Sequence, residues 1–590
     1  MLRKDAQIHC SPSGSRPIVE LVVPQQLLPE IGPRASKRVM RYSGGRGIGL
    51  FVMVTAVGML APFVLTTAAW AQNAAAEAPQ ADSGQATAAT LRTLEDMLAA
   101  EAAHPAVPMV IPPNLPTMDF QQYLDLKKAA PAPGEVKPEA GLAPVPAAPP
   151  TLGPLRCGGL AQFMPIVQGF FPPDTHGAVG ANHYGQIVNS AIRFYSKGLT
   201  GNCPTSIVLS VSLFSFFGYT NQALFDPRIL YDLTYNRWIV SAEAFAESAA
   251  VQRQFIAVSV DSNPTHGFFI YSFNARAWVG SGVFWDYPQI GYDEDAVILT
   301  GNKFNPGFIG ATPVFLPKHR MYAGLGFSFC FFNGGALNVG TLTPPIVLDQ
   351  GPYTTIASVA PGGGFIRMTK WTNGAHACPT FVASNDIPVS TNVPPLAQQP
   401  GFPDCSADPA DCLDTLDGRF QSQGTQNGSP VFGSPVKFWQ VRTNGQGSFP
   451  VPRTYRVNAD TATLEENCFF FLSPTSFDFN PSIVANGTGT LFVTWSATDP
   501  PGGVNAQVRL GGKLLGDACG IIGPGRLVNQ STNPLTGNFD PNHGVQRWGD
   551  TSAITLDPSN TNIVYGVNEK VQTGANPTKW RSFFFNAHNP

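Results

Sequence analysis

Residues 226–242 read Asp-Pro-Arg-Ile-Leu-Tyr-Asp-Leu-Thr-Tyr-Asn-Arg-Trp-Ile-Val-Ser-Ala, and this segment predicts the fold class. Its apolar parts, 229–231 and 237–242, flank a polar turn and predict two short strands, and the segments 255–260 and 268–273 predict two more. Four antiparallel strands in about 50 residues make one small sheet with two apolar faces. Because such a sheet is not stable alone, the sequence predicts that it stacks on copies of itself.

Five further segments repeat the same order of polar opening, apolar strand and turn. The spacing is about 50 to 70 residues, except where the polar insertion 385–435 lengthens the fourth unit, and the six units begin near Pro172, Asp226, Asp286, Tyr353, Asn480 and Arg547. Radial repetition of four-stranded sheets is the β-propeller arrangement, so we predict an all-β propeller of six four-stranded blades, or seven if the insertion contains another. The fourth unit would include the strands at 353–371, 380–384, 437–442 and 453–457. Ring closure predicts that the strand 581–585 completes a blade begun near the start of the domain.

Composition excludes one class of partner. The 590 residues include 59 Gly and 55 Pro, only 13% are charged, and the net charge is -3. A nucleic-acid-binding surface needs a basic patch, so no nucleic-acid partner is expected. The expected partner is a glycan or an extracellular protein, and the chain is expected to be a monomer.

The N-terminal segment 1–71 has the features of an export leader. Arg41 and Arg46 precede the apolar run 48–65, and Ala69-Trp-Ala71 follows it. This order predicts a signal peptide cut before Gln72, and therefore a secreted, periplasmic or cell-surface protein. An uncleaved leader is the alternative, because about 18 apolar residues can just span a bilayer; membrane contact is expected only in that case.

Residues 72–155 form an Ala/Pro-rich linker before the propeller domain, 156–590. Apolar residues at helical spacing predict a short helix near 90–103. The segment 129–154 is too rich in Pro to fold and is expected to act as a spacer.

Four motifs carry a family resemblance: Pro173-Asp-Thr-x-Gly-Ala-Val-Gly180, Asp226-Pro-Arg-x-x-Tyr-Asp232, Asn480-Pro-Ser-Ile483 and Arg547-Trp-Gly-Asp550. The chain resembles exported bacterial propeller proteins described as sialidase-like or as carrying neuraminidase-type repeats. The resemblance implies the fold, and it implies no activity because that group has no general known function. The Asp-box turn of true sialidases, Ser-x-Asp-x-Gly-x-Thr-Trp, is absent; the nearest segment, 486–490, departs from it.

Carboxylates recur at or near the starts of the units, at Asp174, Asp226, Asp286 and Asp550. First strands of propeller blades run beside the central channel, so these residues could ring one mouth of it and bind a sugar or a cation. Their oxygen ligands would suit calcium, although no resident cofactor is required. Each Asp could instead cap its own turn.

Arginines could bind a sugar carboxylate in bidentate fashion, and Arg228 and Arg547 lie beside the recurring Asp residues. Arg193 and Arg367 are further candidates. In each case the guanidinium could instead serve to satisfy backbone carbonyls.

Catalysis would need more than these groups. A sialidase-like site requires a Tyr nucleophile paired with a Glu and a separate acid, and Tyr231 and Glu243 are the available pair. His176 and His183 lie seven residues apart, which is no usual zinc spacing. The sequence therefore favours an exported, non-catalytic binding propeller, with a sialidase-like glycoside hydrolase as the alternative.

The cysteine pattern predicts four disulfides. Cys10 lies in the leader, which leaves an even number of cysteines in the exported part of the chain. Sequential pairing gives three separations near 50 residues, about one blade, and one short loop within the insertion. The predicted bridges are Cys157–Cys203, Cys330–Cys378, Cys405–Cys412 and Cys468–Cys519.

Overall fold

The computed structural model describes residues 77–103, 127, 171–197, 204–349, 351–372, 378–402, 405, 408–428, 435–540, 544–571 and 580–588. The predicted leader and its Cys10 lie outside the described residues, as do Cys157, Cys203 and the spacer 129–154. No helix among the residues described is long and apolar enough to cross a membrane.

The described chain is all-β, and the segment 226–242 forms the heart of one antiparallel sheet. In this sheet Ile229 pairs with Val240, and both side chains are fully buried. The first set of strands is β3 (His176–Val179), β4 (His183–Val188), β5 (Ala191–Lys197) and β6 (Pro204–Ser212). The second set is β7 (Leu224–Asp232), β8 (Arg237–Ser248), β9 (Val251–Ser259) and β10 (Phe268–Asn274).

Three further sets follow in chain order. The third is β11 (Phe284–Tyr292), β12 (Ala296–Phe304), β13 (Phe308–Pro317) and β14 (Phe327–Asn333). The fourth is β15 (Leu342–Thr343), β17 (Tyr353–Val359), β18 (Phe365–Thr372) and β19 (Phe381–Pro388). The fifth is β20 (Gly424–Asn427), β21 (Lys437–Gln446), β22 (Phe449–Asn458) and β23 (Thr463–Phe469).

The prediction for the fourth unit was wrong, because it merged the fourth and fifth sets. The strands at 353–372 and 381–388 form one sheet, and those at 437–446 and 449–458 belong to another. The first strand of the fifth set, β20, lies inside the predicted insertion and has the polar sequence Gly-Thr-Gln-Asn, which carries no apolar strand pattern. A short strand, β16 (Pro345–Val347), pairs in parallel with both β11 and β20 and joins the third and fifth sets.

Two sets complete the domain. The sixth is β24 (Phe477–Ala485), β25 (Leu491–Asp499), β26 (Val504–Lys513) and β27 (Arg526–Gln530). The last is β30 (Ala553–Asp557), β31 (Asn560–Val571) and β32 (Trp580–His588), and between the two lies the ribbon of β28 (Phe539–Asp540) and β29 (Val545–Gln546). The short helices are α3 (Leu213–Phe217), α4 (Arg276–Val279), α5 (Lys318–Met321), η1 (Pro264–His266), η2 (Gly335–Leu337), η3 (Pro409–Asp411) and η5 (Cys519–Ile521).

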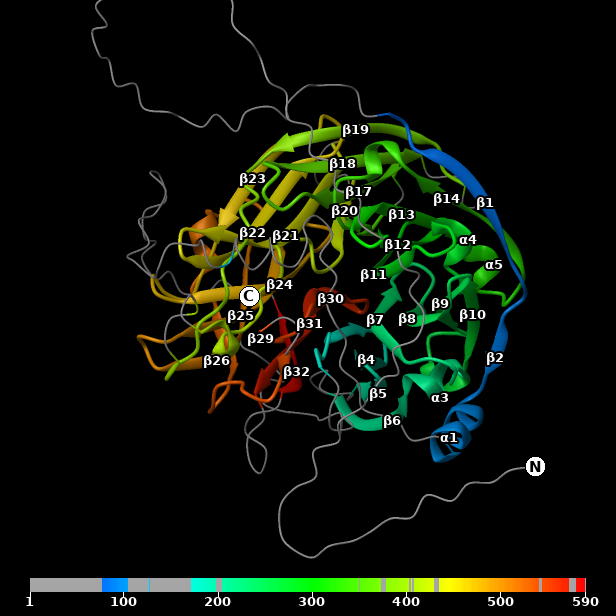
Figure 1. Ribbon diagram of the computed structural model, residues 1–590, viewed down its shortest axis with the longest axis horizontal. Helices are drawn as coiled ribbons and strands as arrows, with labels where there is room; N and C mark the ends of the chain where they lie inside the picture. The colour runs from blue at the N-terminus through cyan, green and yellow to red at the C-terminus, as the bar shows by residue number, and fades with distance from the viewer. Residues whose placement is uncertain are drawn as a thin grey trace, which may run out of the picture. The chain divides into compact units, whose positions relative to one another are not determined.

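The first strands of the sets lie side by side around a common centre. β3 contacts β7, β7 contacts β11, β24 contacts β30, and β30 returns to contact β3. One narrow apolar cavity is lined by residues of β3, β7, β11, β16, β20, β24 and β30. Figure 1 shows the sets following one another in chain order about this centre, from β4 to β32. Such radial repetition is the arrangement of a β-propeller.

The C-terminal strand closes this arrangement differently from the prediction. β32 pairs with β31 and not with a strand of the first set, which has four strands of its own. Side chains make the closing contact instead: the Phe584 ring lies 5.1 Å from that of Tyr184 and 5.6 Å from that of Tyr195. The last and first sets therefore meet face to face.

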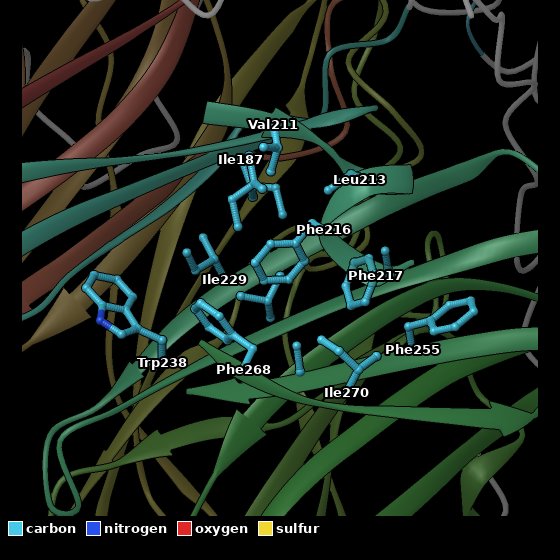
Figure 2. Close-up of a cluster of buried hydrophobic side chains, with 14 of the residues drawn as sticks. Ile187, Val211, Leu213, Phe216, Phe217, Ile229, Trp238, Phe255, Phe268 and Ile270 are labelled. Atoms are coloured by element: carbon cyan, nitrogen blue, oxygen red, sulfur yellow. The ribbon is translucent and has the colours of Figure 1, made fainter. Parts of the chain in front are cut away.

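Apolar side chains between neighbouring sets form the core. In Figure 2, Ile187 and Val211 of the first set lie in one cluster with Ile229, Trp238 and Phe268 of the second. β-branched and aromatic residues recur on both faces of strands such as β8 and β12, so these sheets have two apolar faces and bury both against their neighbours.

The N-terminal residues 80–103 lie on the domain. β1 (Gln80–Ala86) pairs with the outer strand β14, and β2 (Thr90–Arg92) pairs with the outer strand β10 (Figure 1). Helix α1 (Leu94–Ala103) falls within the range where the sequence predicts a helix, and its Met97 is fully buried. Residues 80–92 were predicted to belong to the linker. Their strands could not be recognised from the sequence, because an unpaired sheet edge binds extended chain through backbone groups alone, whatever the side chains are.

Three of the predicted disulfides are present. The Cα–Cα distances are 5.1 Å for Cys330–Cys378, 5.8 Å for Cys405–Cys412 and 5.2 Å for Cys468–Cys519. The first joins the third and fourth sets, and the last joins the fifth and sixth. Structural disulfides persist in oxidising compartments, which fits an extracellular or periplasmic environment. The predicted Cys157–Cys203 bridge lies outside the described residues.

Candidate functional site

The six predicted binding residues come together at one end of the first strands. Asp174 and Asp550 precede β3 and β30, and Asp226 and Asp286 are the third residues of β7 and β11. The residues that line the apolar cavity, such as Val179 and Ile554, come several positions later in the same strands. The channel therefore has a polar end, where the strands begin, and an apolar part beyond it.

A repeated backbone turn positions the side chains of this polar end. Asp174, Asp226, Tyr287 and Asn480 all adopt a positive φ, between 45° and 56°. Proline follows three of them, and the strand register shifts at the same place in β7, β11 and β24. Non-glycine residues in this region of φ carry strain that clusters at functional sites. The second, third and sixth sets thus present one polar or aromatic residue from the same kind of bulge, and Asp174 adopts the same backbone conformation just before β3.

Hydrogen bonds link this end across three sets. The Asp174 carboxylate accepts from Asn189 Nδ2 at 2.6 Å and from the backbone N–H of Asp550 at 2.8 Å. Asn189 Oδ1 in turn accepts from the backbone N–H of Asp226 at 2.9 Å. Asp174 therefore bonds to the last set. Asp232, which lies outside the site, is the contrasting case, because its carboxylate caps its own turn by accepting from the backbone N–H groups of Thr234 and Tyr235.

Three guanidinium groups accompany the carboxylates. Arg547 Nη2 lies 2.6 Å from Asp550 Oδ1, and Arg419 Nε lies 2.9 Å from Asp417 Oδ1. Arg228 Nε donates to the carbonyl of Pro288 at 3.1 Å, as the alternative interpretation of such arginines expected. Its Nη1 and Nη2 are buried, and neither has a hydrogen-bond partner among the described residues.

Tyr287 lies between two of these groups and was not among the residues predicted from the sequence. Its ring centroid is 4.5 Å from the Arg419 guanidinium carbon and 5.5 Å from that of Arg228, and its hydroxyl donates to the carbonyl of Asp550 at 3.3 Å. A signal was present: Tyr287-Pro repeats the X-Pro step of Asp226-Pro and Asn480-Pro.

Glu243 of β8 joins Asp226 and Asp286 in a compact group of three carboxylates. Ligand oxygens of all three lie within 4.8 Å of one another, and all three residues are buried. Glu243 Oε1 accepts from the backbone N–H of Tyr287 at 3.1 Å. Burial, with the nearby Asp286 charge, raises the pKa of Asp226 to about 7 and the pKa of Glu243 well above its usual range.

A second buried glutamate, Glu569 of β31, lies near Asp174 and Asp550 and was also missed. Neither of its carboxylate oxygens has a hydrogen-bond partner in the described part of the chain. Burial raises its pKa, and the charges of Asp174 and Asp550 raise it further. A Cβ on Gly549 would lie 2.6 Å from Glu569 Oε2, which explains the glycine of the Trp-Gly-Asp motif.

The remaining candidates lie elsewhere. Tyr231 is opposite Trp238 at the far end of the β7–β8 hairpin, whereas Glu243 is opposite Phe225, so the predicted Tyr–Glu pair does not form. Arg193 Nε donates to Ser210, and Arg367 pairs with Asp386. The two histidines come from different places in the first set: His176 is fully buried, with Nε2 3.3 Å from Gln423 Oε1, and His183 begins β4.

Comparisons with known proteins give only distant likenesses. No protein-family model and no curated protein matches the chain. A protein of unknown function from Dyadobacter fermentans matches at 7% identity and a TM-score of 0.34, over 62% of this chain and 94% of its own. An α-L-arabinofuranosidase from Fusarium graminearum matches at 8% identity and a TM-score of 0.32, over 70% and 92%. Trypanosoma rangeli sialidase in complex with sialic acid matches at 9% identity and a TM-score of 0.31, over 68% and 57%. At these scores the likenesses carry no conclusion about ligand or activity.

Proposed function

We propose that this protein is an exported, non-catalytic β-propeller that binds a glycan at the polar end of its central channel. The observation that carries the proposal is that buried donors on Arg228 and buried acceptors on Glu569 occur there without hydrogen-bond partners among the described residues. Buried polar groups are normally paired, and leaving one unpaired costs about 1–3 kcal/mol. A sugar hydroxyl both donates and accepts, so one polyhydroxylated ligand could satisfy both kinds of group.

The predicted binding residues Asp174, Asp226, Asp286, Arg547 and Asp550 would surround this ligand. Asp226 and Asp550 are each 7% exposed, more than the other members of the group, so the ligand would enter beside them. The alternative partner is an extracellular protein that inserts a polar side chain at the same place. In either case the chain would act as a monomer.

The architecture that we propose with this function is a ring of seven blades, the alternative that the sequence left open beside six. The first strands of six sets contribute to the lining of the central cavity, and β16, which precedes β17 of the fourth set in the chain, is the seventh strand in that lining. A ring also explains why the site takes residues from the first, second, third and last sets. Signal cleavage before Gln72 and export beyond the cytoplasmic membrane complete the proposal.

The alternative, a sialidase-like glycoside hydrolase, lacks its nucleophile in the described residues. The Tyr231 hydroxyl donates to Asn236, and the Tyr287 hydroxyl donates to a backbone carbonyl. Neither hydroxyl bonds to Glu243, whose oxygen accepts from a backbone N–H instead. Activation of a Tyr nucleophile needs an adjacent base, so this geometry favours binding over hydrolysis.

A glycan array probed with the full-length exported protein, beside a panel of fluorogenic glycosides, tests the proposal. Arg228→Lys keeps the charge but loses the planar fork, and we expect it to weaken binding by about tenfold or more. Arg193→Lys, a buried arginine outside the site, is the matched control and should bind as the wild type does. Binding that survives both Arg228→Lys and Glu569→Gln would refute the site. Turnover of a glycoside that disappears in Glu243→Gln would favour the hydrolase.

A further inference from the structure

The group of three carboxylates, Asp226, Glu243 and Asp286, is built from three strands of two neighbouring sets. Asp226 and Asp286 lie at the register shifts of β7 and β11, and Glu243 lies on β8 opposite Phe225. Their exposed fractions are 7%, 0% and 5%. The ligand oxygens, one from each residue, lie within 4.8 Å of one another, which is the separation that ligands of one ion have.

Glu243 gives an independent indication that a further group binds between these oxygens. Its Oε1 accepts from the Tyr287 N–H, but its Oε2 has no hydrogen-bond partner among the described residues, although the side chain is fully buried. A carboxylate oxygen taken out of water is stable only with a donor, a proton or a cation. The other two members of this group are carboxylates as well, and these cannot donate while ionised.

Charge and ligand chemistry select the ion. In the ion-bound state the three carboxylates would be ionised, and with the Arg228 guanidinium beside them their charges sum to -2, which one divalent cation neutralises. All ligands are oxygens, which suits calcium or magnesium rather than zinc. Magnesium sheds its water reluctantly, and this buried group leaves little room for a hydration shell, so calcium is the better match. Arg228 is held aside by its bond to the Pro288 carbonyl and by the Tyr287 ring.

We propose that Asp226, Glu243 and Asp286 bind one calcium ion at the polar end of the channel. The ion ties the bulge of β7 to that of β11 and fixes the turn that presents Tyr287 between Arg228 and Arg419. Asp226 and Asp286 are also among the residues proposed to surround the glycan, so the two proposals share this end of the channel. Calcium binding is measured without a glycan, so it can succeed or fail separately from the glycan array.

Calorimetric titration of the EDTA-treated full-length protein tests the proposal, with calcium chloride and magnesium chloride as the probes. We expect one calcium ion per chain, magnesium weaker by about tenfold or more, and a higher melting temperature with calcium. Glu243→Gln and Asp286→Asn should each weaken calcium by about tenfold or more. Asp478→Asn is the matched control, because Asp478 is also a fully buried carboxyl with its pKa raised to about 7, and it should leave calcium affinity unchanged.

A second measurement locates the ion in the wild-type protein even if the variants do not fold. Crystals soaked in terbium chloride, a calcium substitute, should give an anomalous peak among the three carboxylates. The proposal is overturned if the stripped wild type shows no saturable calcium binding, if the control loses calcium as the variants do, or if the terbium peak lies elsewhere.

Discussion

The contact between the last and first sets makes a sharp prediction about how the ring is held together. Phe584 of β32 is fully buried, and its ring lies 5.1 Å from that of Tyr184 on β4. Phe584→Ala removes this ring and leaves a cavity, at a cost of about 3–5 kcal/mol of unfolding free energy. That loss alone does not show which contact was broken, so the test is a double-mutant cycle with Tyr184→Leu.

We expect the two substitutions to be coupled by about 1 kcal/mol, because an aromatic pair contributes about 0.5–1.5 kcal/mol beyond its buried area. Phe583 provides the matched control. It is the preceding residue on the same strand, is equally buried, and points to the opposite face, where it packs with Val484 and Phe492 of the sixth set. Phe583→Ala should cost a similar amount but should add to Tyr184→Leu within about 0.5 kcal/mol.

Urea unfolding of the disulfide-intact protein, followed by circular dichroism and tryptophan fluorescence, provides the four free energies of each cycle. Coincident transitions by the two probes establish the two-state behaviour that the cycle needs. Equal coupling in the Phe584 and Phe583 cycles would refute the reasoning, since it would mean that the ring does not close through this aromatic contact.

Three further predictions follow from buried groups and cross-links. Burial, with the Arg228 charge, lowers the pKa of His176 to about 3, below its unfolded value of about 6.5. The stability that the neutral imidazole contributes is therefore complete above pH 6.5. It is lost as the pH falls, by about 2 kcal/mol of unfolding free energy at pH 5. His176→Gln should flatten this part of the stability–pH curve in urea titrations, and an unchanged slope would contradict it. Cys330→Ser opens a cross-link between residues 48 apart and should lower the unfolding free energy by about 4 kcal/mol in the chain-entropy model. Cys405→Ser, whose partner is seven residues away, should lower it by about 2.5 kcal/mol. Chemical denaturation with free-thiol counting checks this order. Gly549→Ala should lower the melting temperature through a loss of about 1–3 kcal/mol, because the new Cβ meets Glu569, and the double variant with Glu569→Ala should regain part of that loss.

The sequence by itself determined the class of fold, because its information is local. Alternating apolar residues between Gly, Pro and Asn turns define short strands, as in the β7–β8 hairpin, whatever the rest of the chain does. Two of the predicted disulfides could be assigned for a similar reason: separations of 48 and 51 residues correspond to one set of strands and its neighbour. The recurring Asp residues were found because each unit opens with the same turn.

Only the tertiary structure decided how the units are divided and what the site contains. β20 has no apolar pattern, since it is a short polar strand paired on both sides through backbone groups that every residue possesses. Glu243 and Glu569 lie on second strands, where the sequence gives no motif. Glu243 is opposite Phe225, beside the bulge of β7, and Glu569 lies on β31 beyond the residues that pair with β30. Their raised pKa values arise from burial by segments remote in the chain, and burial is a property of packing that no local pattern encodes.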